Sequence, residues 1–328
     1  GRWSDDVRQS MEGQIVATTG ASYCDHGVFV GRYSTILVHF FLTGCNALAP
    51  RDVDDLSNDI VELATGWPER LSAALSLEHE AEHAELLSLK FAHAFEDMYM
   101  RKTAPEQAAR DISMLEQVSD KQPVVGDLHQ DERGRTNLRL YQLHNIMLSE
   151  MLPKLDNFGL VVIDQFADSV ADAANSQYTI DTFRLEGVRS GKTATINEAA
   201  HNLVDAIEAV FTGRVTDDGL NQLILAADVT WQAVDMVRGY LGYARQLGLR
   251  YTPSRLVEIL LAQPGMVGSL WNYFHARFDP ALTGDRQRAM SESKERFEAQ
   301  RRTLRNHDQD VTFKTLFNLI ESTLRTNF

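Results

Sequence analysis

The sequence predicts an α+β protein in which two short strand–helix units are separated by helices and followed by an all-helical region. A β-branched and aromatic run is followed by an amphipathic helix pattern near the start of the chain, and a second such succession begins near residue 136. After Gly191 only helical patterns remain. The predicted boundaries are residues 1–76 for the first α+β unit, 77–135 for a helical connector and linker, 136–190 for the second α+β unit and 191–328 for a helical domain.

The first α+β unit is predicted from a strand pattern and from the helix pattern that follows it. Residues 35–42, TILVHFFL, are β-branched and aromatic enough for a buried strand. Gly44 and Pro50 interrupt the chain, and residues 52–64 then carry apolar side chains at helical spacing. Acidic residues open that helix, where the helix dipole favours them.

The connector is predicted to be helical and to end in a loop. Residues 68–118 show helical periodicity throughout, with a restart at Pro105. Residues 121–135 contain Pro123, two glycines and several charges. This composition predicts a loop or linker.

The second α+β unit begins with a strand at residues 138–143, where apolar and polar side chains alternate. A helix is predicted over residues 148–158, and Pro153 inside it indicates a kink or a late start. Gly159 is well suited to the left-handed position that ends a helix. Further strands are predicted at 160–166 and 177–185.

The last part of the chain is predicted to be helical because apolar residues recur there at helical spacing. Glycine and proline separate the segments. The predicted helices cover residues 196–211, 231–247, 255–261, 266–278, 285–307 and 311–325.

Composition narrows the function. The net charge of −14 repels nucleic-acid phosphates and anionic membrane surfaces. No apolar run approaches the roughly 18 residues that a membrane-spanning helix needs. The two cysteines, Cys24 and Cys45, are too few for a disulfide framework. We therefore expect a cytoplasmic protein without nucleic-acid or membrane partners.

The stretch HEAEH, which begins at His79, reads as the H-E-x-x-H pattern of zinc hydrolases. On one helix His79 and His83 would lie one turn apart, and Glu80 would be the general base for a metal-bound water. A catalytic zinc also needs a third protein ligand. The metzincin extension is missing, since Leu86 and Leu89 stand in its place. We interpret the stretch as the acidic start of a helix with solvated histidines, and a zinc hydrolase is the less favoured alternative.

Nucleotide-binding motifs are incomplete or missing. GVRSGKT, residues 187–193, has three residues between its glycines, whereas a Walker loop has four. No G-x-G-x-x-G fingerprint is present. We therefore expect a basic strand-to-helix loop at this position and no cofactor bound by this chain.

Five aromatic residues of the helical part lie at helical spacings, for which packing in the core is the expected role. They are Trp231, Tyr240, Tyr243, Trp271 and Phe274.

Four segments of the second half resemble blocks of one enzyme family in the same order. The segments are LPKLDNFGLVVIDQ (152–165), DDGLNQLILAADVTWQAVDMVRGYLGYARQLG (217–248), ARFDP (276–280) and LFNLIESTLRTNF (316–328). The chain is similar through them to the large, high-molecular-weight bacterial NAD-dependent glutamate dehydrogenases. The resemblance extends over nearly the whole chain.

In that family the block ending in L-R-T-N-[FY] lies just before the catalytic domain. The resemblance therefore implies an amino-terminal, non-catalytic portion with regulatory and assembly roles. NAD would be the cofactor of the parent enzyme, which would convert L-glutamate, NAD and water to 2-oxoglutarate, ammonia and NADH. The implied partners are the chain's own catalytic domain and the other subunits of a homo-oligomer.

The resemblance also implies that the two α+β units are ACT-like modules, βαββαβ domains that bind amino acids in other proteins. Their ligand site commonly uses the turn between the first strand and the first helix. In the second α+β unit the residues of this turn, His144, Asn145 and Met147, are the candidate effector-binding residues, although the turn lacks the usual glycine. In the first α+β unit the turn contains Gly44 within a longer loop. We expect structural or oligomer-building modules, with amino-acid binding as the alternative.

An independent amino-acid sensor built on the same modules is the alternative function. The two functions differ in whether the reading frame continues past Phe328 into a glycine-rich nucleotide-binding region. The sequence leaves the oligomeric state and the identity of any effector open.

Overall fold

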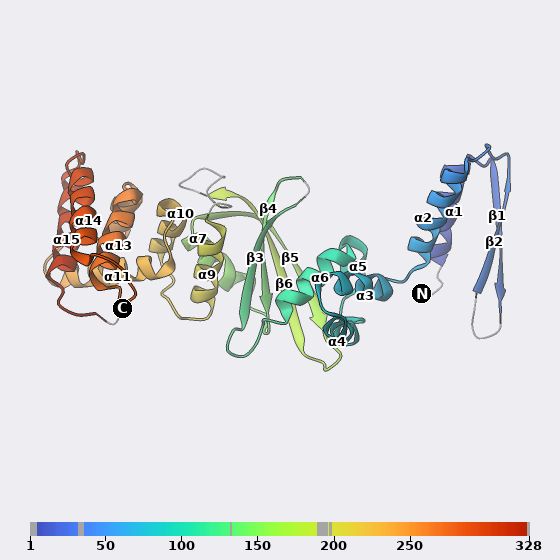
Figure 1. Ribbon diagram of the computed structural model, residues 1–328, viewed down its shortest axis with the longest axis horizontal. Helices are drawn as coiled ribbons and strands as arrows, with labels where there is room; N and C mark the ends of the chain where they lie inside the picture. Colours follow the sequence, from blue (N-terminus) through green and yellow to red (C-terminus); the bar gives the residue numbers. More distant parts are fainter. Residues whose placement is uncertain (1–4, 32–35, 132, 189–195, 197–198, 327–328) are drawn as a thin grey trace. The chain divides into compact units, whose positions relative to one another are not determined.

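The computed structural model describes residues 5–31, 36–131, 133–188, 196 and 199–326 (Figure 1). The chain is α+β, with helices around a two-stranded and a four-stranded sheet, as the sequence predicts. It divides into two units, the first formed by residues 1–113 and 171–175 and the second by residues 114–170 and 176–328. No helix among the described residues is long and apolar enough to cross a membrane.

The first sheet is an antiparallel hairpin of two strands accompanied by two helices. The strand and helix predicted at 35–42 and 52–64 are confirmed within one or two residues. A further strand pairs with the predicted one over its whole length, so that Tyr23 lies opposite Thr43. The elements are α1 (Asp5–Thr19), β1 (Tyr23–Val30), β2 (Ile36–Thr43) and α2 (Pro50–Ala64).

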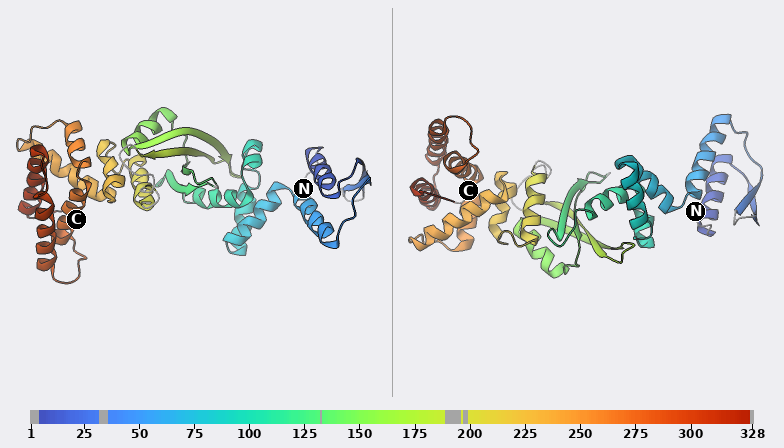
Figure 2. Two further views of the ribbon diagram at one scale, coloured as in Figure 1. Left: turned by 90° about the horizontal axis from the view of Figure 1, so that it is seen from above. Right: turned by 60° about the horizontal axis from the view of Figure 1, so that its bottom comes forward.

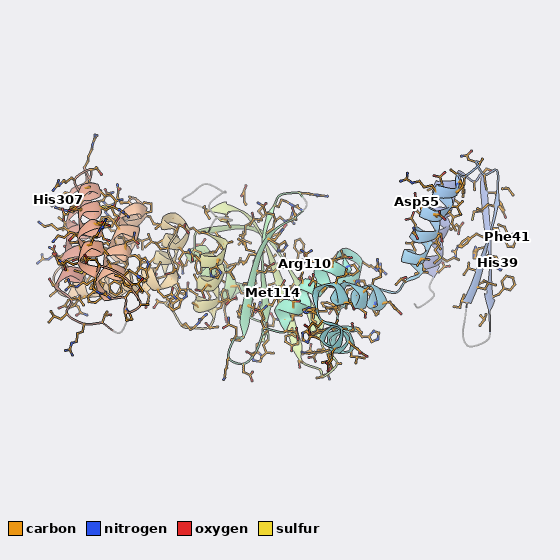
Figure 3. All side chains as sticks on the ribbon, in the orientation of Figure 1. His39, Phe41, Asp55, Arg110, Met114 and His307 are labelled. Atoms are coloured by element: carbon orange, nitrogen blue, oxygen red, sulfur yellow. The ribbon has the colours of Figure 1, made fainter. Side chains whose placement is uncertain are left out.

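The hairpin has one exposed apolar face, which we call the outer face. Strand alternation places on it Tyr23, Phe29, Leu37, His39 and Phe41, all of which are exposed. On the opposite face Phe40 and its neighbours towards the base of the hairpin are half-buried, whereas Val28, Val30 and Ile36 are exposed. In Figure 3, His39 and Phe41 point away from α2.

Helices form most of the rest of the first unit, so the prediction of helix over residues 68–118 is confirmed except at the breaks between them. They pack around Phe91, Phe95 and Tyr99, and the rings of Phe95 and Tyr99 stack 4.4 Å apart. The Tyr99 hydroxyl donates to the buried Asp111 at 2.5 Å, which joins two of the helices. The elements are α3 (Trp67–Glu78), α4 (Ala81–Phe91), α5 (Asp97–Lys102) and α6 (Pro105–Leu115).

The four-stranded sheet of the second unit contains a strand that the sequence did not indicate. Residues 121–135, predicted to be a loop or linker, include β3, which pairs with the next strand from Val124↔Gln142 to Gln130↔Thr136. Gly126 and Asp127 interrupt the apolar alternation of β3, and this pattern suits an edge strand. The sheet order is β3-β4-β6-β5, with β3 (Val124–Gln130), β4 (Thr136–Gln142), β5 (Leu160–Ala171) and β6 (Gln177–Val188).

Two helices accompany this sheet. Helix α7 (Leu148–Asn157) connects β4 to β5 and contains Pro153 without interruption. It ends before Gly159, whose φ of +76° is the left-handed conformation that the sequence predicts there. Helix α9 (Ala200–Phe211) packs on β3, where a Cβ at Gly126 would come within 3.0 Å of Val204.

The remaining helices pack side by side in the orange-to-red part of Figure 2. The prediction of one helix over 285–307 is confirmed as far as Arg301 and is wrong for its last six residues. The chain leaves α14 after Arg301, and the Asn306 side chain accepts hydrogen bonds from the N–H groups of Asp308 and Gln309, which starts a new helix. The elements are η2 (Gly219–Gln222), α10 (Leu223–Ala227), α11 (Trp231–Gln246), α12 (Pro253–Leu261), α13 (Pro264–Phe278), α14 (Arg286–Arg301) and α15 (His307–Ser322).

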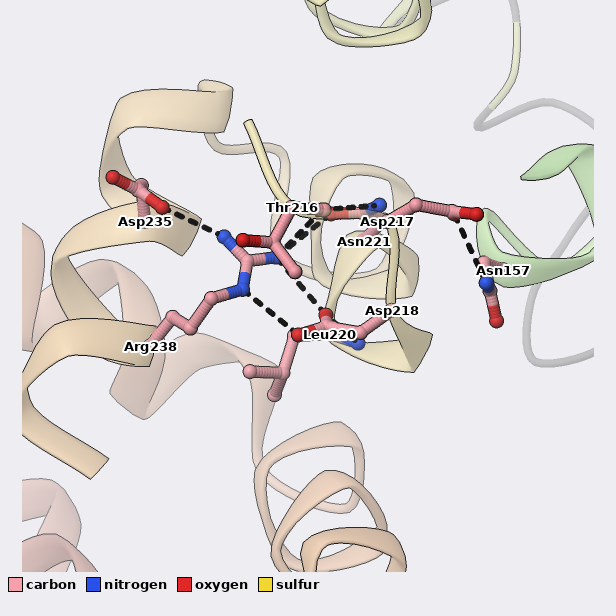
Figure 4. Close-up of polar contacts among 8 residues, drawn as sticks. All are labelled: Asn157, Thr216, Asp217, Asp218, Leu220, Asn221, Asp235 and Arg238. Atoms are coloured by element: carbon pink, nitrogen blue, oxygen red, sulfur yellow. Dashed lines mark hydrogen bonds and ion pairs between the residues drawn. The ribbon is translucent and has the colours of Figure 1, made fainter. Parts of the chain in front are cut away.

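Arg238 on α11 connects this helix to the loop that precedes η2 (Figure 4). Its guanidinium donates to both oxygens of Asp218 at 2.8 and 2.9 Å and to Asp235 at 2.9 Å. It also donates to Asn221 at 3.0 Å and to the Thr216 carbonyl at 3.3 Å. Burial alone would lower the pKa of Arg238, but Asp218 and Asp235 raise it above its ordinary value. The loop is therefore held by a permanently charged, bidentate donor.

Replacing Arg238 by Met should destabilise the second unit by about 2–4 kcal/mol, because the Asp218 carboxylate and the loop carbonyl lose charged hydrogen bonds. Urea unfolding measures this change. Arg255→Met is the matched control, since its carboxylate partners Glu258 and Asp308 form a more exposed pair of contacts. The control should change stability much less, because exposed ion pairs are screened by solvent. Equal effects of the two substitutions would contradict the assignment.

Candidate functional site

The predicted effector turn connects β4 to α7. His144, Asn145 and Met147 are all exposed, with 67% of Met147 accessible. Met147 is the N-cap residue of α7 in an extended conformation and makes no side-chain capping hydrogen bond. The turn thus presents three exposed side chains at the start of a helix.

Gln142, the last residue of β4, forms a hydrogen bond with the backbone of this turn. Its side-chain oxygen accepts a hydrogen bond from the Ile146 N–H at 3.1 Å. Its side-chain nitrogen donates to Asp181 of β6 at 2.5 Å. Gln165 of β5 donates to the other Asp181 oxygen. We call Gln142, Gln165 and Asp181 the polar cluster.

Two members of the polar cluster are buried in the sheet. Gln142 is fully buried and Asp181 is 3% exposed, whereas Gln165 is half-buried. Burial raises the pKa of Asp181 above its ordinary value, and the hydrogen bonds from Gln165 and Gln142 offset part of this effect. Because each carboxylate oxygen accepts an amide hydrogen bond from a neighbouring strand, the cluster fixes the position of the turn. The sequence contained no signal for it beyond three polar residues inside strand patterns.

Replacing Asp181 by Asn should change how stability depends on pH. Since the folded pKa lies above the unfolded one, Asp181 contributes stability that is complete below the unfolded pKa and is lost as pH rises through the folded pKa. Relative to Asp181→Asn, the wild-type chain should therefore be most favoured near pH 4 and lose that advantage towards pH 7, in denaturant unfolding at several pH values between about 4 and 7.

The matched control is Asp131→Asn. The pKa of Asp131 is lowered by hydrogen bonds from the Arg135 backbone and side chain and the Arg133 backbone. Its contribution is present above the unfolded pKa and is lost as pH falls, so this variant should show the opposite trend. A difference between wild type and Asp181→Asn that stays constant with pH would refute the role given to burial.

The corresponding turn of the first α+β unit contains Gly44, as the sequence indicated. Its φ is +72°, and a Cβ there would come within 2.1 Å of the Ser22 hydroxyl oxygen. That hydroxyl donates to the Thr43 carbonyl at 3.1 Å. Gly44 thus closes the base of the hairpin against the preceding turn, and this packing accounts for the glycine.

The HEAEH stretch does not lie on one helix. Helix α3 ends at Glu78, and both His79 and Glu80 have extended backbone conformations before α4 begins. The premise that His79 and His83 are one helical turn apart is therefore wrong. Their rings contact edge to face at 5.2 Å, and the His79 Nε2 atom is 2.9 Å from the Ser113 hydroxyl. No group of three or more His, Cys, Asp or Glu residues suited to a metal occurs in the described part of the chain.

Most of the GVRSGKT stretch, residues 189–193, lies outside the described residues, so the expectation of a basic loop there stays a prediction.

The aromatic residues at helical spacings are not all core residues. Phe274 is buried, whereas Tyr243 is 51% exposed. All five of them line a cavity beside α11 and α13. The prediction of plain core packing is therefore wrong for Tyr243 and incomplete for the others, because one side of the aromatic group has no helix packed against it.

Comparison with known families identifies two segments of the second unit. A family model described as glutamate dehydrogenase, ACT3 domain, matches residues 126–199. A model described as glutamate dehydrogenase, helical motif 3, matches residues 215–280. The first match contains the predicted effector turn and the polar cluster, and the second contains Arg238 and the aromatic cavity's two helices.

Three NAD-specific glutamate dehydrogenases are similar to this chain over nearly its whole length. The NAD-specific glutamate dehydrogenase of Mycobacterium tuberculosis is 28% identical over 350 residues, which cover 100% of this chain and 21% of that protein. The enzymes of the same name from Halomonas elongata and Pseudomonas aeruginosa are each 26% identical, over 99% of this chain and 20% and 21% of their own lengths. The chain spans about a fifth of the length of the curated relatives it matches. The predicted resemblance to the large NAD-dependent glutamate dehydrogenases is confirmed, and the chain corresponds to a segment of such proteins.

Proposed function

We propose that this chain is a regulatory and assembly segment of an NAD-dependent glutamate dehydrogenase. The observation that carries the proposal is the similarity of the whole chain to about a fifth of three NAD-specific glutamate dehydrogenases. In the intact enzyme L-glutamate, NAD and water would give 2-oxoglutarate, ammonia and NADH. NAD and glutamate would bind to parts of the enzyme other than this segment, which would act in the cytoplasm as part of the whole enzyme.

The proposed organisation has two ACT-like modules, residues 1–76 and 136–190, joined by the connector 77–135 and followed by the helical domain 191–328. The family match at 126–199 supports the second module. Its element order, β4-α7-β5-β6, supports it as well. For the first module the support is the hairpin and its two helices.

The assembly role is supported by the outer face of the hairpin. Its aromatic side chains are exposed, among them Tyr23 (59%), Phe29 (57%) and Phe41 (59%). The strands β1 and β2 are the only members of their sheet in the described residues. Contiguous exposed apolar side chains of this kind mark interaction surfaces. The proposed partners are other copies of this chain within a homo-oligomer, together with the enzyme's own catalytic domain.

The regulatory role is assigned to the turn with His144, Asn145 and Met147. An amino-acid effector would bind there through its carboxylate and ammonium groups. Because the Ile146 N–H already donates to Gln142, the ligand would use the other backbone groups and the exposed side chains. The polar cluster would hold the turn in place before the ligand arrives.

Calorimetric titration with a panel of amino acids tests the effector turn. The expected result is saturable binding of one class of amino acid, weakened about ten-fold or more in His144→Ala/Asn145→Ala, since two polar contacts are removed. Asn306→Ala, which alters an N-cap outside the turn, should bind with wild-type affinity. Absence of binding by every amino acid would refute the effector site and leave the assembly role standing.

An activity assay of this chain alone tests whether glutamate oxidation takes place in other parts of the enzyme. Incubation with glutamate and NAD should produce no NADH above the background without protein. A longer polypeptide that contains this segment and the remainder of the enzyme should produce NADH under the same conditions. Glutamate-dependent NADH formation by residues 1–328 alone would overturn the proposal.

A further inference from the structure

The second unit contains a cavity of about 900 Å³ that the proposed function does not use. Helices α11 and α13 form two of its walls, and the segment that follows α15 forms the third. The volume lies within the range of sites for small-molecule ligands. The cavity lies within the helical part of the chain, away from the turn with His144.

The aromatic side chains of the cavity form a preorganised group. The rings of Trp271 and Phe274 stack with centroids 5.7 Å apart, and Tyr240 meets Phe274 edge to face at 6.2 Å. Trp231 is fixed by the hydrogen bond from its indole nitrogen to Asp205 at 2.8 Å. Tyr243, in contrast, is half exposed and faces solvent at the cavity rim. Flat π surfaces held in this way suit a planar ligand.

The third wall is fastened to the helices by polar contacts. The hydroxyl groups of Tyr240 and Thr323 are 2.8 Å apart. The Arg277 guanidinium donates to the Thr323 carbonyl at 2.8 Å. These contacts place Arg325, two residues further on, among the residues that line the cavity.

The cavity also has polar groups at its rim. Asp235 is 53% exposed, and one of its oxygens accepts from Arg238 at 2.9 Å. Gln232 and Thr230 contribute an amide and a hydroxyl. Arg325 supplies a positive charge. A purely apolar occupant, such as the hydrophobic face of a helix, would leave these groups without compensation for lost water.

We propose that this cavity binds a nucleoside monophosphate. The planar base would stack on the aromatic side chains, the sugar hydroxyls would donate to Asp235, and the phosphate would pair with Arg325. An aromatic amino acid offers a flat ring but carries no phosphate for Arg325 and no sugar hydroxyls for Asp235. The net charge of −14 disfavours a nucleic-acid polymer, whereas one phosphate needs only the local arginine. The proposal does not rest on the dehydrogenase function.

Tryptophan fluorescence of the whole chain tests the proposal, with adenosine monophosphate, adenosine and phenylalanine as probes. Adenosine monophosphate should change the emission saturably, and adenosine should bind more weakly. Tyr243→Ala should weaken binding of both adenosine and adenosine monophosphate about five-fold or more, as expected for loss of a stacking partner. Arg325→Gln should weaken binding of the monophosphate to the level of adenosine and leave adenosine itself unchanged.

Two controls separate the cavity from the rest of the molecule. Leu89→Ala removes an exposed apolar side chain of the first unit and should leave binding unchanged. Trp67→Phe removes a tryptophan of the first unit, and the fluorescence change should persist. The proposal is overturned if adenosine monophosphate produces no saturable change, if Tyr243→Ala binds it as tightly as wild type, or if phenylalanine binds more tightly. Equal affinities for adenosine and its monophosphate would overturn the role of Arg325.

Discussion

The Arg238 guanidinium is the contact on which the order of the second unit depends most. It joins α11 to the loop before η2 through both oxygens of Asp218. The neighbouring Asp217 accepts a hydrogen bond from Asn157 at the end of α7, at 2.9 Å. Gly159 then follows in a left-handed conformation, with the Gln222 side chain 3.2 Å from where a Cβ would be. One charged side chain thus sets the loop through which the sheet and the helices meet, and a neutral replacement could not satisfy as many acceptors.

The second unit also uses the buried carboxylate of Asp181 and the half-buried carboxylate of Glu208 as acceptors for amide donors. Asp181 binds Gln142 and Gln165 in the sheet. Glu208 on α9 accepts from the Gly126 N–H at 2.9 Å and from Gln122 at 3.0 Å. Burial raises the pKa of both carboxyl groups. Glu208 supplies an acceptor to an edge strand that lacks a neighbour on that side, while Asp181 holds a turn. Both carboxylates fix the position of neighbouring backbone segments. This structural role accords with a segment that is proposed to regulate and assemble.

Periodicity predicted the elements whose apolar pattern is unbroken, such as β2, β4, α7 and α11. It missed β1 and β3, because Asp25, Gly27, Gly126 and Asp127 interrupt the pattern at edge strands, where packing demands little of one face. It also missed the break between α3 and α4, since no glycine or proline marks it. The candidate turn was found from a family resemblance, whereas the polar cluster beneath it depends on pairing between β4 and β6 that one sequence does not reveal. The cavity depends on where the segment after α15 runs, which is likewise a matter of tertiary structure.

Sedimentation velocity of the chain tests the proposed assembly role most directly. Wild-type protein should associate with increasing concentration, because the outer face of the hairpin is apolar and exposed. Phe29→Ser/Phe41→Ser should shift it to the monomer, while Leu77→Ser, at an exposed apolar position on α3, should not. A wild-type chain that stays monomeric at every concentration, or a double variant that associates as strongly as wild type, would contradict the account.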